Sequence, residues 1–307
     1  MKNDYVIVTP AYNEEEFIGS TIESVARQTI LPVRWIIVDD GSGDKTAEIV
    51  SDYAKRYDFI ELHRRERKPE HTYYGSNVYA ILEGYEKIRH LDHDFIAVLD
   101  ADIELSCNYY EQIFKRFDMH PELGIATGTY LEKIDGNFRE AQIDRRSTPK
   151  ALQVFRKSCY EQIGGYIPCS NGGEDSCAEI MARMHGWQTW SFPEIKTIHK
   201  KPVGTGDGSS LLGARFRLGL TDYTLSTHPL FMLAKCFRRC VIEKPYIASG
   251  VCRFAGFVNG YLKGEARHIN GDVKKFVRQE QLSRLMKLPG MASKSWKPRE
   301  DIYQEKK

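Results

Sequence analysis

An apolar segment of the chain runs directly into a cluster of carboxylates. In FIAVLDADIEL, residues 95–105, Asp100, Asp102 and Glu104 follow the apolar run at alternate positions. Carboxylates this close repel one another unless positive charge lies between them, and oxygen ligands suit hard cations such as Mg²⁺ and Mn²⁺. The segment is therefore either a solvated turn after a strand or part of a cation site, and Asp-x-Asp alone does not decide. Glu104 is either a further ligand or a solvated acid.

The elements that must position these acids alternate between strand and helix. Apolar runs predict strands over residues 4–10, 33–40, 59–62 and 94–100. Helical spacing predicts helices over residues 14–28, 42–57 and 75–88. We expect Pro10 to end the first strand, and Ser42 or Asp44 to cap the second helix. This order implies parallel strands joined by helical crossovers, and therefore an α/β fold.

Polar segments follow three of these strands. They read TPAYNE (9–14), VDDGSGD (38–44) and DADIE (100–104). Ligands of parallel sheets bind beyond the carboxyl ends of the strands. Three such ends at one edge therefore indicate a polar binding site more strongly than any one of them.

The later part of the chain changes character. Strands are expected at residues 124–131, 151–157 and 186–193, with helices at 107–117 and 174–185. From Leu211 onward the pattern is helical, over residues 211–225, 229–239, 250–264 and 272–288. The sequence thus predicts a helical C-terminal region after the α/β part.

Composition and charge narrow the class of protein. The 307 residues are 41% hydrophobic and 28% charged, as in a globular protein with a substantial core. The net charge is +2, but residues 211–290 carry 14 Lys and Arg against 5 Asp and Glu, a net of +9 that leaves −7 elsewhere. This basic region favours an anionic membrane surface or an anionic acceptor, and we expect no nucleic acid partner. The alternative is a helical subdomain that packs on the sheet or on a second copy in a homodimer.

The cysteines and the N-terminal residues indicate the cellular compartment in which the protein is expected. The seven cysteines are odd in number and form no Cys-x-x-Cys pair, which argues against a disulfide framework or a zinc site. The N-terminus leads directly into a strand without a signal peptide, and Arg253 and Lys263 interrupt the best apolar run. We expect a cytoplasmic protein that does not cross a membrane, with the inner membrane face as a place where it can lie.

Four segments resemble the signature regions of glycosyltransferase family 2. They are VIVTPAYNEEEFIGSTIESVARQT, IIVDDGSGDKT, VLDADIEL and GGEDSCAEIMARMHGWQ, which appear in the family's order within about residues 4–200. The resemblance implies a GT-A fold, a Rossmann-like, mostly parallel sheet flanked by helices, over residues 1–205. Its nucleotide-sugar half is expected at about 1–105 and its acceptor half at about 106–205. A helical region at 206–290 and a polar tail at 291–307 would follow.

The same resemblance implies roles for the carboxylates. Asp102 is the expected direct ligand of a divalent cation, Mn²⁺ or Mg²⁺. Asp100 lies by the ribose and reaches the metal directly or through water. His199 is either a further metal or diphosphate contact or a structural histidine.

The nucleotide contacts implied by the resemblance lie at the strand ends. They are Pro10, Ala11, Tyr12, Glu14, Asp39, Asp40, Asp100 and Ala101. Arg65 follows the third strand with Arg64 and Arg67, and one of these is expected to reach the base or phosphates while the others are solvated. A carboxylate that accepts from a pyrimidine N3–H is sensible chemistry, and a turn with a helix cap is the alternative explanation of Asp39 and Asp40.

GGEDSCAEI matches the segment that carries the family's catalytic base. The resemblance assigns Asp175 as the base that deprotonates the acceptor, with Glu174 close to the acceptor or orienting the loop. The alternative is that both are first-turn acids stabilised by a helix dipole. The glycine-rich residues 201–210 resemble a flap that closes over the donor.

The leading interpretation is a metal-dependent, inverting glycosyltransferase. It would move a sugar from a nucleoside-diphosphate sugar to a glycan or polyprenyl-linked acceptor in bacterial surface polysaccharide or glycolipid assembly. The alternatives are a sugar-nucleotide nucleotidyltransferase and a non-catalytic nucleotide-sugar-binding protein. Nucleotidyltransferases usually carry Arg and Lys after the first strand, where this chain has the acidic TPAYNEEEF.

Overall fold

The structure is a computed structural model, which describes residues 3–68, 70–134, 137–141, 143–201 and 210–286. The chain divides into two compact units, Met1–Ala214 and Arg215–Lys307. Each unit is described by itself. The expected flap and the expected polar tail fall on residues 202–209 and 291–307, outside the described residues, as does the expected domain boundary at 205.

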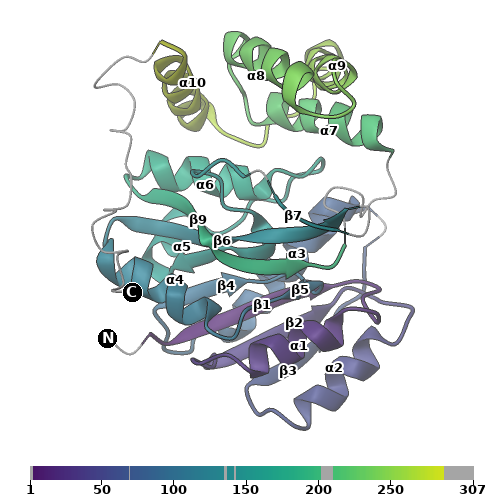
Figure 1. Ribbon diagram of the computed structural model, residues 1–307, viewed down its shortest axis with the longest axis vertical. Helices are drawn as coiled ribbons and strands as arrows, with labels where there is room; N and C mark the ends of the chain where they lie inside the picture. Colours follow the sequence, from purple (N-terminus) through teal and green to yellow (C-terminus); the bar gives the residue numbers. More distant parts are fainter. Residues whose placement is uncertain (1–2, 69, 135–136, 142, 202–209, 287–307) are drawn as a thin grey trace. The chain divides into compact units, whose positions relative to one another are not determined.

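The first half of the N-terminal unit is a parallel sheet with helical crossovers (Figure 1). Its strands are β1 (Tyr5–Ala11), β2 (Arg34–Asp39), β3 (Ile60–Arg64) and β4 (Phe95–Val98), which lie in the order β3-β2-β1-β4. Its helices are α1 (Ile18–Ala26), α2 (Thr46–Ala54) and α3 (Tyr73–Ile88). Every pairing among these strands is parallel, which confirms the prediction from the alternating sequence pattern.

Pro10 does not end the first strand, contrary to the sequence-based expectation. β1 continues to Ala11, and Pro10 pairs with Val38 of β2. The carbonyl of Val8 accepts from Leu99 N at 3.2 Å on the β4 side, and the β1–β4 pairing ends at Val8. Pro10 faces that same side two residues later, so its missing N–H costs no ladder hydrogen bond.

The first two helices begin later than the sequence indicated. Helix α1 starts at Ile18, and α2 starts at Thr46 with no side-chain cap from Lys45. The reason is that the loops after β1 and β2 bind each other. Glu14 N donates to Thr46 Oγ1 at 2.7 Å, and Glu15 N donates to Asp44 Oδ2 at 3.0 Å. Asp44 also accepts from Thr46 N, the first residue of α2, at 3.0 Å, so it holds the helix start as expected and joins the two loops as well.

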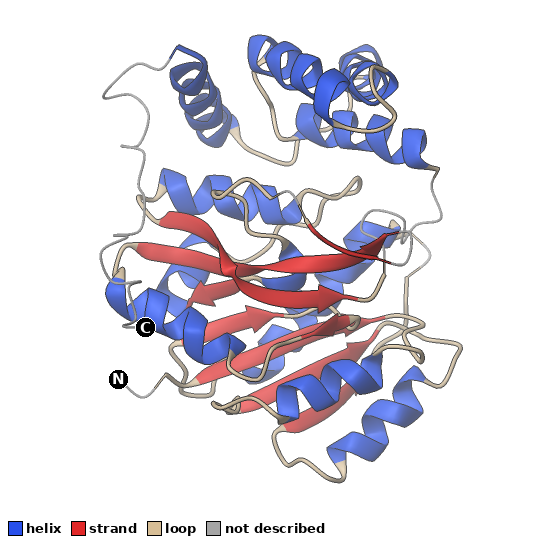
Figure 2. Ribbon diagram, in the orientation of Figure 1, coloured by secondary structure: helices blue, strands red, loops and turns tan. Residues whose placement is uncertain are grey.

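The second half of the unit extends the same sheet with mixed pairing (Figure 2). Its strands are β5 (Ile103–Glu104), β6 (Leu123–Ile134), β7 (Asn137–Glu140), β8 (Val154–Arg156) and β9 (Gln188–His199). Its helices are α4 (Tyr109–Met119), η1 (Lys150–Leu152), α5 (Lys157–Ile163) and α6 (Glu174–Met184). β8 pairs antiparallel with β4, and the order continues β8-β6-β9-β5. The strand expected over residues 151–157 is shorter because the short helix η1 occupies its start.

The core of this unit lies on both faces of the sheet. All seven residues of β1 are buried, which fits a central parallel strand covered by helices on both sides. The Trp35 indole donates to Thr9 Oγ1 at 2.9 Å, so its one polar atom is satisfied. Tyr5 packs against Tyr110 and Phe114 of α4, with ring centroids 4.6 and 5.0 Å away. These contacts fix the strand whose carboxyl end carries the first polar loop.

The C-terminal unit is helical, as the sequence predicts. Its helices are α7 (Leu211–Thr224, which begins just before the unit), α8 (Pro229–Ile242), α9 (Ala248–Lys263) and α10 (Gly271–Met286). Among the helices of the described ranges, none has the length and apolar character needed to cross a membrane.

Candidate functional site

The carboxyl ends of β1, β2 and β4 bring the predicted residues to one edge of the sheet. β1 lies between β2 and β4, so the loops that begin at Tyr12, Asp40 and Leu99 are neighbours. Asp40 N donates to Ala11 O at 2.8 Å, and Ala101 O accepts from Thr21 Oγ1 at 2.8 Å. The backbone at these strand ends is therefore held by hydrogen bonds, and the side chains beyond it are positioned on a rigid rim.

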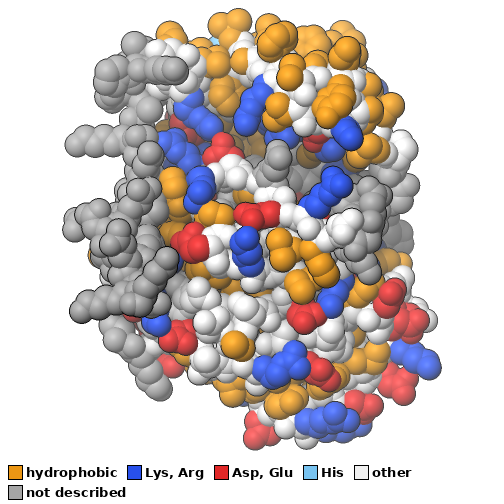
Figure 3. All heavy atoms as spheres, in the orientation of Figure 1, with side chains coloured by type: hydrophobic (Ala, Val, Ile, Leu, Met, Phe, Trp, Pro, Cys, Tyr) orange, Lys and Arg blue, Asp and Glu red, His pale blue; other side chains and the backbone are white. Residues whose placement is uncertain are grey.

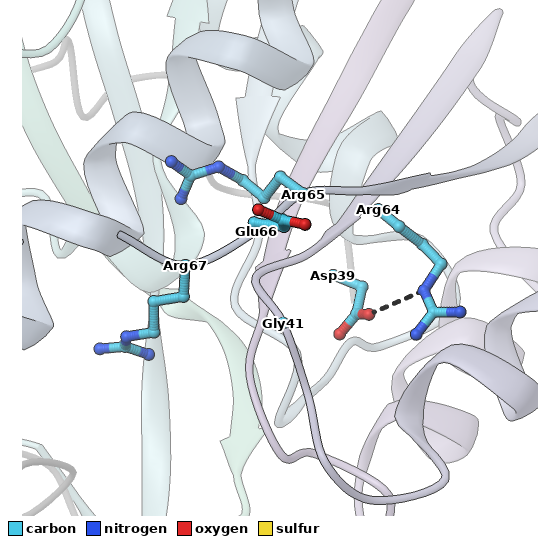
Figure 4. A pocket seen from close by; sticks show the side chains of 6 residues that line it. All are labelled: Asp39, Gly41, Arg64, Arg65, Glu66 and Arg67. Carbon is cyan, nitrogen blue, oxygen red and sulfur yellow. Dashed lines mark ion pairs between the residues drawn. The ribbon is translucent and has the colours of Figure 1, made fainter. Parts of the chain in front are cut away.

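An open pocket of about 550 Å³ lies beside the end of β2 (Figure 4). Its lining is Asp39, Gly41, Arg64, Arg65, Glu66 and Arg67. Asp39 is buried, and its Oδ1 accepts from Ser42 N at 3.1 Å. Its Oδ2 lies 3.4 Å from Arg64 Nε but accepts no hydrogen bond among the described residues. Asp39 is therefore held in the wall of the pocket by Ser42 and by the charge of Arg64.

Asp40 differs from Asp39 because internal partners occupy its carboxylate. Its Oδ1 accepts from Arg65 Nη1, and its Oδ2 accepts from Ser76 Oγ at 2.7 Å. Arg65 also reaches Glu83, with 3.0 Å between Nε and Oε2. The side chains of Asp40 and Arg65 are both buried. The pair thus joins β2 and β3 to α3, and their predicted nucleotide contacts stay a prediction.

Arg67 connects this pocket to the carboxylate rim. Its guanidinium carbon lies 4.1 Å from the ring centroid of Tyr12 and 5.6 Å from that of Tyr73. Its Nη1 is 3.6 Å from Asp40 Oδ2. The charges of Asp100 and Glu14 help to raise the pKa of Tyr73, after the larger effect of burial, which places that ring near both acids. An aromatic wall therefore runs from the pocket to the rim.

Asp102 and His199 form a buried pair at the rim. The antiparallel pairing of β5 with β9 sets Ile103 opposite His199 and brings His199 Nε2 to 3.4 Å from Asp102 Oδ1. Burial by itself would raise the pKa of Asp102, but the hydrogen bond and charge of His199 outweigh it and lower that pKa. For His199, burial opposes protonation, and Asp102 raises its pKa in return. The structure thus brings together two of the predicted metal ligands.

Two other acids of the rim are paired with lysines that follow β9. Lys201 Nζ lies 2.6 Å from Glu14 Oε2, and burial raises the pKa of Glu14 to about 7 despite this lysine. Lys200 Nζ lies 2.5 Å from Glu104 Oε2, and both side chains are partly exposed. The partner of Glu104 is therefore a lysine, an arrangement that matches a surface ion pair.

Lys150, which the sequence analysis missed, neutralises Asp100. It belongs to η1, and its Nζ donates to Asp100 Oδ1 at 2.5 Å. Burial alone would lower the pKa of Lys150, but the charges of Asp100 and Glu174 outweigh burial and raise it. Lys150 therefore lies between an acid of the first half of the sheet and an acid of α6.

Glu174 and Asp175 start α6 after two glycines with left-handed backbone, Gly172 at φ 79° and Gly173 at φ 98°. Burial raises the pKa of both acids, and the charge of Asp175 adds to the effect on Glu174. Glu174 Oε2 is buried without a hydrogen-bond partner in the described part of the chain. A backbone hydrogen bond from Lys150 reaches Asp175. Both acids can therefore accept a proton from a nearby hydroxyl group.

Glu179, also missed by the sequence analysis, fastens η1 to α6. It is buried one turn after Asp175, and its Oε1 accepts from Thr148 Oγ1 at 2.9 Å and from Thr148 N. Arg183 Nη1 lies 3.8 Å from Glu179 Oε2. No motif marks Lys150 or Glu179 in the sequence. Only the pairing of distant segments shows their roles.

Asp102 and His199 are the side chains of the rim that can hold a divalent cation. In the described ranges, no three His, Cys, Asp or Glu side chains are grouped closely enough to hold a metal ion. Asp100 is directed to Lys150, whereas Asp102 and His199 offer an adjacent oxygen and nitrogen. Mg²⁺ and related ions in phosphate-binding sites often take one or two protein ligands and complete the shell with phosphate oxygens and water. Asp102 and His199 fit that kind of site.

Comparison with known proteins gives one family and several relatives. The family model described as glycosyl transferase family 2 matches residues 6–177. A poly-beta-1,6-N-acetyl-D-glucosamine synthase of Staphylococcus epidermidis is 31% identical over 119 residues, which cover 38% of this chain and 26% of the relative. The uncharacterized glycosyltransferase EpsJ of Bacillus subtilis is 48% identical over 50 residues, which cover 16% of this chain and 14% of EpsJ. The chain thus spans about a quarter or less of these relatives.

Solved structures share the fold at low sequence identity. S. aureus TarS 1–349 in complex with UDP-GlcNAc matches with a TM-score of 0.56 and 15% sequence identity. The matched region covers 92% of this chain and 81% of the TarS chain. The mannosyltransferase PcManGT from Pyrobaculum calidifontis, in complex with GDP-Man and Mn²⁺, has a TM-score of 0.53 and 15% identity, and covers 94% of this chain and 81% of its own. These structures are GT-A glycosyltransferases, which confirms the GT-A fold.

Glu179 provides a pH-dependent prediction. Burial raises its pKa from 4.5 to about 8, so the folded chain keeps a proton that the unfolded chain loses between these values. The free energy of unfolding should therefore fall as pH rises through this window, by at most about 1.4 kcal/mol per pH unit from this group. Glu179→Gln keeps an acceptor for Thr148 and cannot ionise. Urea unfolding of the variant should depend less on pH than wild type, while exposed Glu161→Gln should match wild type. Equal pH slopes for wild type and Glu179→Gln would contradict this assignment.

Proposed function

Since this chain belongs to glycosyl transferase family 2, we propose that it is an inverting transferase that moves a sugar from a nucleoside-diphosphate sugar to a hydroxyl group. One observation carries the proposal. Half-buried Lys150 lies between Asp100, at the nucleotide end of the sheet, and the acids that begin α6. An inverting transfer needs a donor site and a carboxylate base next to each other, and this lysine links the two.

The donor would bind along the edge from β2 to β4. The base would bind in the pocket that Asp39 lines, beside the wall that Tyr12 forms with Arg67. Pro10, Ala11, Glu14, Asp100 and Ala101 lie at the ends of β1 and β4, where the ribose would follow. TarS and PcManGT are named with UDP-GlcNAc and GDP-Man, which supports a nucleoside-diphosphate sugar as the class of donor.

Asp102 and His199 would hold a divalent cation, Mn²⁺ or Mg²⁺. When bound, such an ion neutralises charge that develops on the departing diphosphate. Asp100 would keep its ion pair with Lys150, and the ammonium group of Lys150 would therefore lie at the same edge of the sheet as the cation. The Mn²⁺ named with PcManGT supports this class of cofactor.

The acids of α6 would act on the acceptor. Asp175 takes the proton of the acceptor hydroxyl while that oxygen bonds to the anomeric carbon. The bond from this carbon to the diphosphate oxygen breaks, and its electron pair leaves with the diphosphate. A raised pKa makes Asp175 a better proton acceptor, and Lys150 limits the rise so that the acid can ionise. Glu174 would accept a hydrogen bond at its unpartnered Oε2.

We further place the reaction in the cytoplasm, since all seven cysteines are free thiols. One relative is named as a poly-N-acetyl-D-glucosamine synthase, which supports a surface polysaccharide or glycolipid product. The acceptor would be a glycan or a polyprenyl-linked saccharide. A lipid-linked acceptor requires the enzyme to reach a bilayer.

The two acids at the end of β2 should respond differently to substitution. Asp39→Asn keeps an acceptor for Ser42 N but removes the charge that attracts Arg64 at the wall of the pocket, so affinity for UDP should fall about 10- to 100-fold. Asp40→Asn breaks a buried ion pair and should lower the free energy of unfolding by about 3–5 kcal/mol. Calorimetric titration and urea unfolding of both variants measure these effects. Weak binding by the Asp40 variant at wild-type stability, with normal binding by the Asp39 variant, would reverse the roles.

Asp102 can be tested through metal-dependent binding, separately from turnover. Asp102→Ala should remove the gain in UDP affinity that Mn²⁺ provides, while binding without Mn²⁺ remains. Glu104→Gln is the matched control two residues away, and its Mn²⁺ effect should equal wild type because Glu104 pairs with Lys200. If the Glu104 variant loses the Mn²⁺ effect instead, the metal site involves Glu104. If wild type shows no Mn²⁺ effect, the site holds no cation.

The base is tested by comparing donor binding with transfer. Asp175→Asn keeps its size but cannot take a proton, so transfer should fall by about two to four orders of magnitude with nearly normal affinity for donor. Glu174→Gln should cause a smaller loss. Initial transfer rates with a nucleoside-diphosphate sugar donor measure catalysis, and calorimetric titration with UDP measures binding. An inactive Glu174 variant beside an active Asp175 variant would exchange the assignments, and two active variants would refute a catalytic role for these acids.

A further inference from the structure

Two neighbouring helices of the C-terminal unit expose large apolar side chains. On α8 these are Leu230, Leu233, Phe237 and Val241, whose spacing places them on one helix face. On α9 they are Val251, Phe254, Val258 and Leu262. Phe237 is 75% exposed and Leu262 is 81% exposed, so neither packs into the protein. Figure 3 shows hydrophobic side chains gathered over α8 and α9. We call these eight residues the α8–α9 apolar surface.

The inner side of the same helices is rich in charge. Asp222 of α7 is buried, with Lys235 Nζ 2.7 Å from its Oδ1 and Arg253 Nε 2.9 Å from its Oδ2. Apolar residues are buried beside these ion pairs, and one cluster contains Tyr223, Met232, Cys236 and Phe257. Buried charges are uncommon in proteins whose exterior faces water. Here the ion pairs lie inside and large apolar groups lie outside.

The helices also pack through glycine. A Cβ atom on Gly219 would lie 1.9 Å from Arg253 O, and one on Gly256 would lie 1.9 Å from Phe216 O. A Cβ on Gly250 would lie 2.3 Å from Cys240 Sγ. Close backbone contact through small residues, with polar groups inside, is the packing that helices use when their outer surface is in lipid. Since the large side chains point outward, an apolar environment is needed to cover them.

We propose that the α8–α9 apolar surface inserts into the interface of an anionic lipid bilayer. The helices have 14 and 16 residues, about 21 and 24 Å, which is shorter than a hydrocarbon core of about 30 Å. Such helices fit along the interface of one leaflet. The exposed Arg238, Lys244 and Lys263 lie on or beside the surface, where they can reach lipid phosphates.

Charge favours a lipid partner over a second copy of the chain. Residues 211–290 carry 14 Lys and Arg against 5 Asp and Glu. In a symmetric dimer through this surface, the same basic residues would face one another and repel. An anionic leaflet is attracted to them. The proposal does not depend on the donor or on the chemistry of transfer.

Vesicle co-sedimentation of the full chain tests the surface. Wild type should sediment with vesicles of phosphatidylcholine and phosphatidylglycerol in equal amounts, and much less with phosphatidylcholine alone. Phe237→Gln with Leu262→Gln should lower the partition at least about tenfold, because two large apolar groups leave the lipid. Leu31→Gln with Val33→Gln removes two exposed apolar groups of the N-terminal unit and should leave the partition unchanged. Equal thermal melting of both variants and wild type checks that they fold.

Several outcomes would overturn the proposal. Wild type that stays in solution with both kinds of vesicle would refute it, as would equal partition of wild type and the Phe237/Leu262 variant. Complete release by high salt would show attraction by charge alone, without insertion. Light scattering measures the oligomeric state. A wild-type dimer that the Phe237/Leu262 variant converts to monomer, without binding to either vesicle, would identify a second copy as the occupant.

Discussion

The site depends on compensation of charge between acids that the sheet gathers and bases that later segments supply. Lys150 is the central case. It is half-buried, its Nζ lies 2.5 Å from Asp100 Oδ1, and the charge of Glu174 helps to raise its pKa. Without it, neighbouring carboxylates would repel one another in a site of low dielectric. Glu179 holds the segment that carries this lysine. The position of one short helix therefore sets the charge at both halves of the site.

The two units differ in where they place their charged and apolar side chains. The N-terminal unit buries apolar strands between helices and keeps its acids at the carboxyl edge of the sheet. The C-terminal unit buries the ion pairs of Asp222 and the glycines of its helix crossings, and exposes aromatic and aliphatic side chains. The first arrangement positions polar chemistry in water. The second arrangement fits the lipid-facing role that we propose for the α8–α9 apolar surface.

Sequence periodicity predicted the strands and helices because burial imposes it directly. β1 to β4 and their crossover helices lie where the apolar pattern indicated, and the parallel order follows from that alternation. The expectations failed where another interaction competed. Pro10 stays in its strand because no partner strand needs its N–H. Asp44 accepts from Thr46 N at the start of α2, as a helix cap would, but it also accepts from Glu15 N of the neighbouring loop. The contact with Glu15 is not visible from local sequence.

The sequence by itself determined the α/β alternation, the family motifs and the identity of the acids at the strand ends, because each depends on neighbours within a few positions. Only the tertiary structure decided the partners of these acids. It placed Asp39 against Arg64 at the pocket and paired Asp40 with Arg65 and Ser76. It also brought Lys150 to Asp100 across 50 positions. Such pairings come from sheet order and helix packing, and chain entropy makes no distinction among distant partners until the core forms.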